Sequence, residues 1–153
     1  MKHAILLLGM VLLTSSCTAL HSRSMTMKWG PVDPGKKGTE IRVKMQDNCP
    51  VSVTDLHDAS TVAACQSGSV IRSAAACREA GDTVTWKVQG NGNFNIEFQN
   101  GNPLVSPPSC SGTGGNFHCD GTVSSTAILH KEYEYLVKSG SCPPLDPYFI
   151  RYN

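Results

Sequence analysis

The sequence predicts an all-β protein, a β-sandwich of seven or eight short strands cross-linked by disulfide bonds. Short runs of alternating apolar and polar residues recur along the chain with turn residues between them, a pattern typical of sandwiches. The 153 residues include 14 glycines and 9 prolines, which suits a fold with many turns. Apolar residues make up 40% of the chain, enough for one hydrophobic core.

The N-terminus has the pattern of an export signal. Lys2 and His3 precede an apolar run of ten residues, Ala4–Leu13, about half of the ~20 residues that a membrane-spanning helix needs. Small residues, 14–16, then lead into Cys17. This order resembles the lipobox of bacterial lipoproteins, in which the cysteine is lipidated and begins the mature chain. The alternative is an ordinary secretory signal in which Cys17 is incidental or removed.

We therefore expect a signal peptide at residues 1–16, a polar lipid-anchored tether at 17–38 and a folded domain at 39–153. The sorting rule of the lipoprotein family retains a protein at the inner membrane when Asp follows the lipidated cysteine. Here Thr18 follows Cys17, which implies the periplasmic face of the outer membrane. Without the lipid, the protein would be periplasmic or secreted.

The seven cysteines support export. If Cys17 carries lipid, six remain, and six cysteines can form three disulfide bonds in an oxidising compartment. Fifteen pairings are possible. The two shortest loop closures predict the pairs Cys65–Cys77 and Cys110–Cys119, each worth about 3 kcal/mol of stability.

The first strands of the domain follow from alternation. Ile41–Met45 predicts the first strand, and Val51–Val53 predicts a short second strand after a turn. Residues 55–78 are rich in Ala and Ser and leave two interpretations open. Ala favours a short helix near Ser73–Glu79, whereas the neighbouring Val, Ile and Cys residues fit strand and loop equally well. Trp29 is unusual in a tether and suggests contact with the domain.

The stretch Gly81–Phe98 is predicted to be a β-hairpin that forms the centre of the core. A Gly- and Asn-rich cluster separates two alternating runs, as in hairpins. The apolar positions of the two runs are Val84, Trp86 and Val88, then Phe94, Ile96 and Phe98. We expect Trp86 to be buried between the two sheets, against the second run and against Tyr133 or Tyr135.

The remaining chain is predicted to contain a long loop and three strands. Leu104–Gly121 carries Pro-Pro and Gly-Gly pairs, and a disulfide bond between its two cysteines would stabilise a loop of this length. Thr122–Ser124 predicts a short strand. Lys131–Lys138 alternates with two tyrosines on one face, and Asp146–Tyr152 predicts the last strand.

The order of these segments resembles the cupredoxin fold over about residues 39–153. The segments that carry the resemblance are Gly81–Trp86, Asn95–Phe98, a Pro-containing loop, Tyr133–Tyr135 and Asp146–Ile150. The resemblance implies a Greek-key β-sandwich. It also implies that the first and last strands lie close together, so that the third disulfide bond joins Cys49 to Cys142.

The copper ligands of the cupredoxin family are not found at the matching positions. A blue copper site needs two His, one Cys and a weak axial ligand such as Met. Phe94 stands near the place of the first His, the His that follows Cys119 comes only at position 130, and no Met follows Met45. We therefore expect no metal and no cofactor.

Other motifs do not indicate an enzyme. The sequence contains no hydrolase elbow, phosphate-binding loop or zinc-protease motif. His118 next to Cys119 resembles a metal-binding pair, and His57 between Asp55 and Asp58 resembles an acid–base cluster. Exposed loop positions explain both patterns more simply.

Lys and Arg number 13 against 12 Asp and Glu, and removal of the leader with Lys2 leaves 12 against 12. This balance predicts no binding of nucleic acid or anionic lipid through charge. The sequence thus predicts a non-catalytic binding or structural lipoprotein. Its partners are the membrane, through an N-terminal lipid, and an envelope or secreted protein.

Two other functions remain as alternatives. One is an inhibitor or immunity lipoprotein that blocks a toxic or lytic enzyme by inserting the Phe117–Gly121 loop as a wedge. The other is a copper or redox protein, which the residues at the expected ligand positions disfavour.

Overall fold

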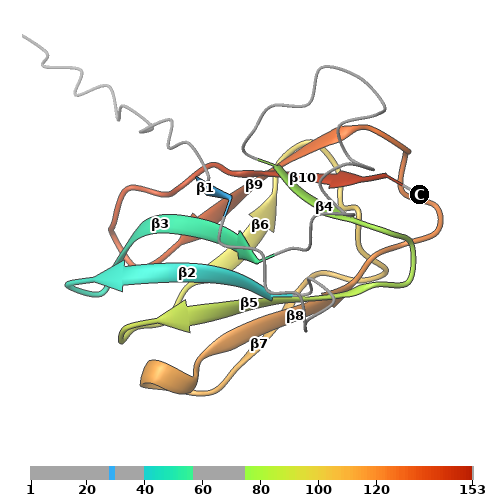
Figure 1. Cartoon of the computed structure of the whole chain (residues 1–153). Coiled ribbons are helices and arrows are strands. Elements are labelled where there is room, and N and C mark those ends of the chain that lie inside the picture. The colour runs from blue at the N-terminus through green and yellow to red at the C-terminus, as the bar shows by residue number, and fades with distance from the viewer. Residues whose placement is uncertain (1–27, 30–39, 57–74, 153) are drawn as a thin grey trace, which may run out of the picture.

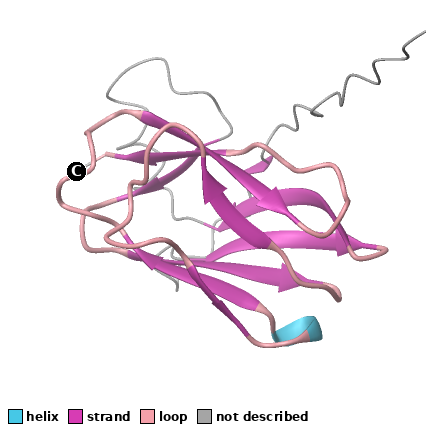
Figure 2. Cartoon of the chain, turned by 180° about the vertical axis from the view of Figure 1, so that it is seen from behind, coloured by secondary structure: helices cyan, strands magenta, loops and turns pink. Residues whose placement is uncertain are grey.

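The computed structural model describes residues 28–29, 40–56 and 75–152. In this part of the chain, ten strands form two mixed β-sheets that pack face to face (Figures 1 and 2). The predicted all-β fold class is confirmed. Among the described residues, no helix has the length and apolar character needed to cross a membrane.

Sheet A contains six strands, and sheet B contains four (Figure 1). The strand order in sheet A is β1 (Lys28–Trp29), β3 (Cys49–Leu56), β2 (Glu40–Gln46), β5 (Thr83–Gln89), β8 (His118–Thr122) and β7 (Ser109–Ser111). The order in sheet B is β4 (Ala75–Arg78), β10 (Tyr148–Arg151), β9 (Glu132–Lys138) and β6 (Asn95–Phe98). The parallel pairs are β1–β3, β2–β5 and β4–β10, and the other neighbours are antiparallel.

Two turns in sheet A depend on residues that tolerate positive φ. Asp47 and Asn48 have φ values of 51° and 61° and connect β2 to β3, as in the two-residue hairpin turns with positive φ at both positions. Gly112 follows β7 with φ at +88°. A Cβ at this glycine would lie 2.5 Å from the carbonyl oxygen of Asn116, so the turn before β8 requires glycine.

The core lies between the sheets and is built by the period-two pattern of the strands. Its members include Ile41, Val43, Val84, Trp86, Ile96, Tyr133, Tyr135, Val137 and Phe149. Trp86 is fully buried, and its ring contacts Tyr135 with a centroid distance of 5.8 Å and Phe98 and Phe149 at 6.4 Å. The predicted burial of Trp86 is confirmed. Phe94 packs edge-on against Phe117 instead.

The predicted hairpin is wrong, although its two strands exist. β5 pairs with β2 and β8 in sheet A, whereas β6 pairs with β9 in sheet B. The segment between them therefore crosses from one sheet to the other. Strands that face the same core from opposite sheets show the same apolar alternation as strands paired in a hairpin, because only the buried face shapes the pattern.

The predicted long loop Leu104–Gly121 is also wrong in part, because it contains β7 and most of β8. Strands β1 and β7 were not expected, and they raise the number above the seven or eight predicted. The strand predicted at Thr122–Ser124 ends at Thr122 in the structure, and Val123 continues only as an isolated bridge to Leu104. In the Ala-rich region, residues 75–78 are a strand, which supports the strand interpretation over the helix.

Candidate functional site

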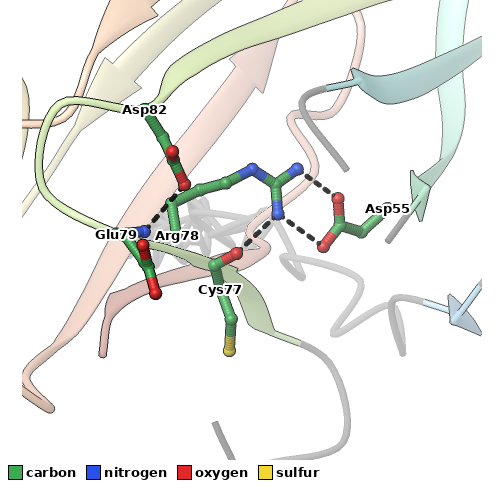
Figure 3. Close-up of polar contacts among 5 residues, drawn as sticks. All are labelled: Asp55, Cys77, Arg78, Glu79 and Asp82. Carbon is green, nitrogen blue, oxygen red and sulfur yellow. Dashed lines mark hydrogen bonds and ion pairs between the residues drawn. The ribbon is translucent and has the colours of Figure 1, made fainter. Parts of the chain in front are cut away.

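A buried ion pair joins the two sheets. Asp55 from β3 and Arg78 from β4 face each other across the sandwich (Figure 3). Nη2 of Arg78 donates to Oδ1 of Asp55 at 2.5 Å, and Nη1 donates to Oδ2 at 3.1 Å. Nη1 also donates to the carbonyl oxygen of Cys77 at 2.7 Å. The two side chains are only 2% and 1% exposed, so the bidentate pair is fully enclosed.

The turn after β4 is fixed by a second carboxylate. Oδ2 of Asp82 accepts a hydrogen bond from the backbone N–H of Glu79 at 2.9 Å (Figure 3). This contact holds the chain as it leaves sheet B and enters β5 of sheet A. Arg78 is thereby presented from a strand end whose backbone is fixed.

Two aromatic side chains with polar atoms lie near the ion pair. Burial raises the pKa of Tyr135 most, the Trp86 indole lowers this pKa, and Asp55 raises it while Arg78 lowers it. The Tyr135 hydroxyl, the Trp86 Nε1 and the Arg78 Nε have no hydrogen-bond partner of good geometry. Tyr135 is therefore a neutral phenol over the ordinary pH range.

This polar cluster is structural. Asp55, Arg78, Trp86 and Tyr135 are each at most 2% exposed, so a substrate in solution has no access to them. Asp55 belonged to the acid–base cluster considered from the sequence, but the structure pairs it with Arg78. His57 and Asp58, the other members, lie outside the described residues. One sequence signal could have revealed Asp55, which continues the buried alternation after Val53.

Disulfide bonds join Cys49 to Cys142 and Cys110 to Cys119, and both pairs agree with the prediction. Cys110 and Cys119 are directly opposite each other on β7 and β8. Cys77 is disulfide-bonded as well, but its expected partner Cys65 lies outside the described residues. The predicted lipidation site, Cys17, also lies outside them.

His118 is on strand β8 rather than in a loop. Its Nδ1 lies 3.0 Å from the carbonyl oxygen of Asn116, and its Nε2 lies 3.2 Å from the Ser111 hydroxyl and 3.4 Å from Oδ2 of Asp120. Neighbouring Cys119 points into the core and is disulfide-bonded, so the two do not form a metal pair. No group of three or more His, Cys, Asp or Glu able to hold a metal occurs among the described residues.

The wedge expected at Phe117–Gly121 is wrong. Phe117 is only 8% exposed and Cys119 is fully buried, so neither side chain can insert into a partner. Most of this segment is strand β8, paired on both sides. Its apparent loop character came from the surrounding glycines.

Three large apolar side chains are exposed on two neighbouring loops. Ile128 is 62% exposed, Leu129 49% and Val105 70%. The loops are adjacent, because the Val105 N–H donates to the carbonyl oxygen of Thr122 at 2.8 Å and the Ser124 N–H donates to that of Pro103 at 2.8 Å. The sequence signal for this patch was a pair of large apolar residues, Ile-Leu, outside any alternating run.

Side chains and backbone groups hold the Ser124–His130 loop in one shape. Nη1 of Arg151 donates to the carbonyl oxygens of Ser125 and Ala127 at 2.8 and 2.7 Å. The Ile128 N–H donates to the Tyr133 hydroxyl at 2.7 Å, and the His130 N–H donates to the carbonyl oxygen of Arg151 at 2.8 Å. The loop is thus anchored to β9 and β10 while its apolar tip faces solvent.

The chain matches no family model, no curated protein and no solved structure. The polar cluster and the Ser124–His130 loop must therefore be interpreted from their own chemistry.

Proposed function

We propose that the chain is a non-catalytic binding module, a cupredoxin-like Greek-key domain anchored by lipid at Cys17 to the periplasmic face of the outer membrane. The strand order of the two sheets supports a cupredoxin-like domain, in particular the parallel neighbours β2 and β5 in sheet A. The apolar run before Cys17 supports the anchor.

The observation that carries the binding function is the Ser124–His130 loop. Binding energy at protein interfaces concentrates in a few large side chains that fill pockets on the partner. A loop already held in its bound shape loses less conformational entropy on binding. Ile128 and Leu129 meet both conditions, because they are exposed on a loop whose backbone is fixed by Arg151 and Tyr133. The expected partner is an envelope or secreted protein with an apolar pocket.

Photo-crosslinking tests this proposal. A photoreactive amino acid at position 128 of the full-length protein should capture one protein partner from the cell envelope. Leu129→Ser should reduce that capture at least tenfold, since ~1.4 kcal/mol corresponds to tenfold in affinity. Thermal stability should change little because about half of the Leu129 side chain is exposed. The control is Gln89→Ser, which replaces an exposed residue at the C-terminal end of β5. Undiminished capture by Leu129→Ser contradicts the proposal.

The same loop favours a second candidate function, an inhibitor or immunity lipoprotein. Two adjacent apolar side chains on a braced loop can enter the cleft of a lytic or toxic enzyme. In that case the crosslinked partner is an enzyme, and its activity falls when the wild-type protein is added but not when Ile128→Ser is added. A partner without such activity leaves the first candidate in place.

A copper or redox function gains no support from the described residues. Cys119, the cysteine considered as a copper ligand, is bonded to Cys110. Copper thiolate sites require a free cysteine sulfur.

A further inference from the structure

Three basic side chains gather on the outer face of sheet A. Arg42 and Lys44 of β2 alternate with buried Ile41 and Val43, so they point away from the core. Lys87 of β5 points the same way and lies directly opposite Arg42 in the pairing of β2 with β5. All three side chains are exposed. Strand spacing places the Cβ atoms of Arg42 and Lys87 about 5 Å apart.

Two acids on the same face, Glu40 and Asp120, offset the charge of this basic triangle only in part. Glu40 contacts the Arg42 Nε at 2.8 Å, and no carboxylate of the described residues lies within ion-pair distance of Lys44 or Lys87. Asp120, the other acid on this face, accepts from the Thr85 hydroxyl at 2.6 Å. Like charges directly opposite each other destabilise a sheet. An external anion bound between the two cations would be attracted to both and would offset their repulsion.

The outer face of sheet B has the opposite charge. Glu132 and Glu134 of β9 alternate with buried tyrosines and point outward, as does Glu97 of β6. Lys138 neutralises Glu97, with 2.5 Å between Nζ and Oε2. On the described strands, the outer face of sheet A thus carries three basic side chains against Glu40 and Asp120. Sheet B carries three acidic side chains against Lys138, with Arg151 at the end of β10, so the excess charge is positive on sheet A and negative on sheet B. The balanced composition concealed this division, because no run of like charges occurs along the chain.

We infer that the outer face of sheet A docks on the anionic phospholipid headgroups of the membrane to which the chain is tethered. This inference rests on the proposed lipid anchor at Cys17. An exposed sheet face suits an array of phosphates better than a small ligand, which is normally bound in a concave site. The acidic face of sheet B is repelled by the same surface, so both faces favour one orientation.

The tether is long enough to allow this contact, and it keeps the domain close to the membrane. Lys28 and Trp29 form β1 at the edge of sheet A, and the eleven residues from Cys17 to Lys28 span at most about 40 Å. A tethered domain meets the surface at high effective concentration, so a few weak contacts suffice. Each Lys or Arg near an anionic surface strengthens binding about fivefold, and salt weakens it.

Amine modification of the lysines tests the docking. The full-length mature lipoprotein is reconstituted into vesicles of phosphatidylcholine, with or without phosphatidylglycerol, and labelled with an amine-reactive acetyl ester. Lys44 and Lys87 should react about fivefold more slowly when phosphatidylglycerol is present, and high salt should remove the difference. Lys131 and Lys138, which belong to β9 and the turn before it, are the matched controls and should react equally in both vesicles.

A double variant, Lys44→Gln with Lys87→Gln, tests the same docking. This variant should lose the phosphatidylglycerol-dependent protection near Arg42, which is measured as backbone hydrogen exchange of β2 on the same vesicles. Equal labelling of Lys44 in both vesicle types overturns the docking, as does protection by inorganic phosphate on neutral vesicles, which would identify a free-ion site. If the chain does not float with either kind of vesicle in a density gradient, it lacks the lipid anchor. That result refutes the proposed function as well.

Discussion

The space between the two sheets contains two regions of opposite chemistry. At its centre, Trp86 is surrounded by the rings of Phe98, Tyr135 and Phe149. Nearby, Asp55 and Arg78 form an ion pair that is as deeply buried as the rings. Burial of the aromatic rings stabilises the folded state, because apolar surface leaves water. The ion pair must first overcome the cost of removing two charges from water.

The difference teaches that burial alone does not identify what stabilises this fold. Aromatic side chains can pack in several arrangements, whereas a bidentate carboxylate–guanidinium pair requires one geometry. We infer that Trp86 supplies stability and that the Asp55–Arg78 pair specifies how β3 and β4 meet. Four predictions test this division, from the largest expected effect to the smallest.

Trp86→Ala should have the largest effect. Loss of a buried aromatic side chain costs about 3–5 kcal/mol, a large share of the 5–15 kcal/mol typical of a domain. We expect the variant to lose cooperative unfolding or to show a much lower denaturant midpoint. Trp29→Ala, in the two-residue edge strand β1, is the control and should barely change the midpoint. Equal shifts for the two variants would mean that the core is not centred on Trp86.

Removing one partner of the ion pair should also destabilise strongly, by about 3–5 kcal/mol, because an uncompensated charge remains buried. Asp55→Ala is the test for the carboxylate and Arg78→Ala for the guanidinium. The double replacement Asp55→Leu with Arg78→Met should recover most of that loss, because no charge is then left in the interior. Chemical denaturation of the three variants measures this. A double variant no more stable than either single variant would show that the pair itself adds net stability to the fold.

Tyr135→Phe should raise stability by about 1 kcal/mol near neutral pH, because the wild-type hydroxyl is buried with no hydrogen-bond partner of good geometry. Burial also raises the pKa of Tyr135 above its ordinary value of about 10. Above pH ~10 the unfolded chain releases this proton while the folded chain keeps it, so wild-type stability falls with rising pH. The variant should lose less stability between pH 9 and 11, roughly the range of tyrosine titration. A variant less stable than wild type at pH 7 would mean that the hydroxyl is hydrogen-bonded in solution.

The smallest effect is expected at the exposed ion pair Lys138–Glu97. The Lys138 hydrogen bond, followed by that of Gln99, lowers the pKa of Glu97. This stabilisation is present above the ordinary carboxyl pKa and is lost as pH falls through the lowered value. Lys138→Gln should raise the pKa of Glu97 in an NMR titration, with little change in the unfolding midpoint. A midpoint shift as large as that of Asp55→Ala would remove the contrast between buried and exposed pairs.

The sequence predicted most of the strands because one buried face determines an alternating pattern. Ile41–Met45 and the tyrosines of β9 were identified in this way, and both lie in the core. Sheet membership was not predictable, since β5 and β6 show the same pattern whether they pair or face each other. β7 was missed because three residues, Ser-Cys-Ser, contain no alternation.

The candidate sites were less predictable than the fold. Contacts such as Asp55–Arg78 and Arg42–Lys87 join residues that are distant in sequence, so only strand pairing reveals them. The Ser124–His130 loop was not predicted from the sequence, because the glycines around Phe117 give the neighbouring segment the stronger loop pattern. Its distinguishing property, two exposed apolar side chains on a braced backbone, is visible only in three dimensions.

The bond between Cys49 and Cys142 has a consequence for how the protein matures. The two cysteines are 93 residues apart, and four others lie between them in sequence. Synthesis proceeds from the N-terminus, so Cys49 meets Cys65 long before Cys142 exists. Oxidation in order of appearance would produce a wrong pair, and thiol–disulfide exchange would have to correct it. Maturation of this domain should therefore depend on a disulfide isomerase, and not only on an oxidant.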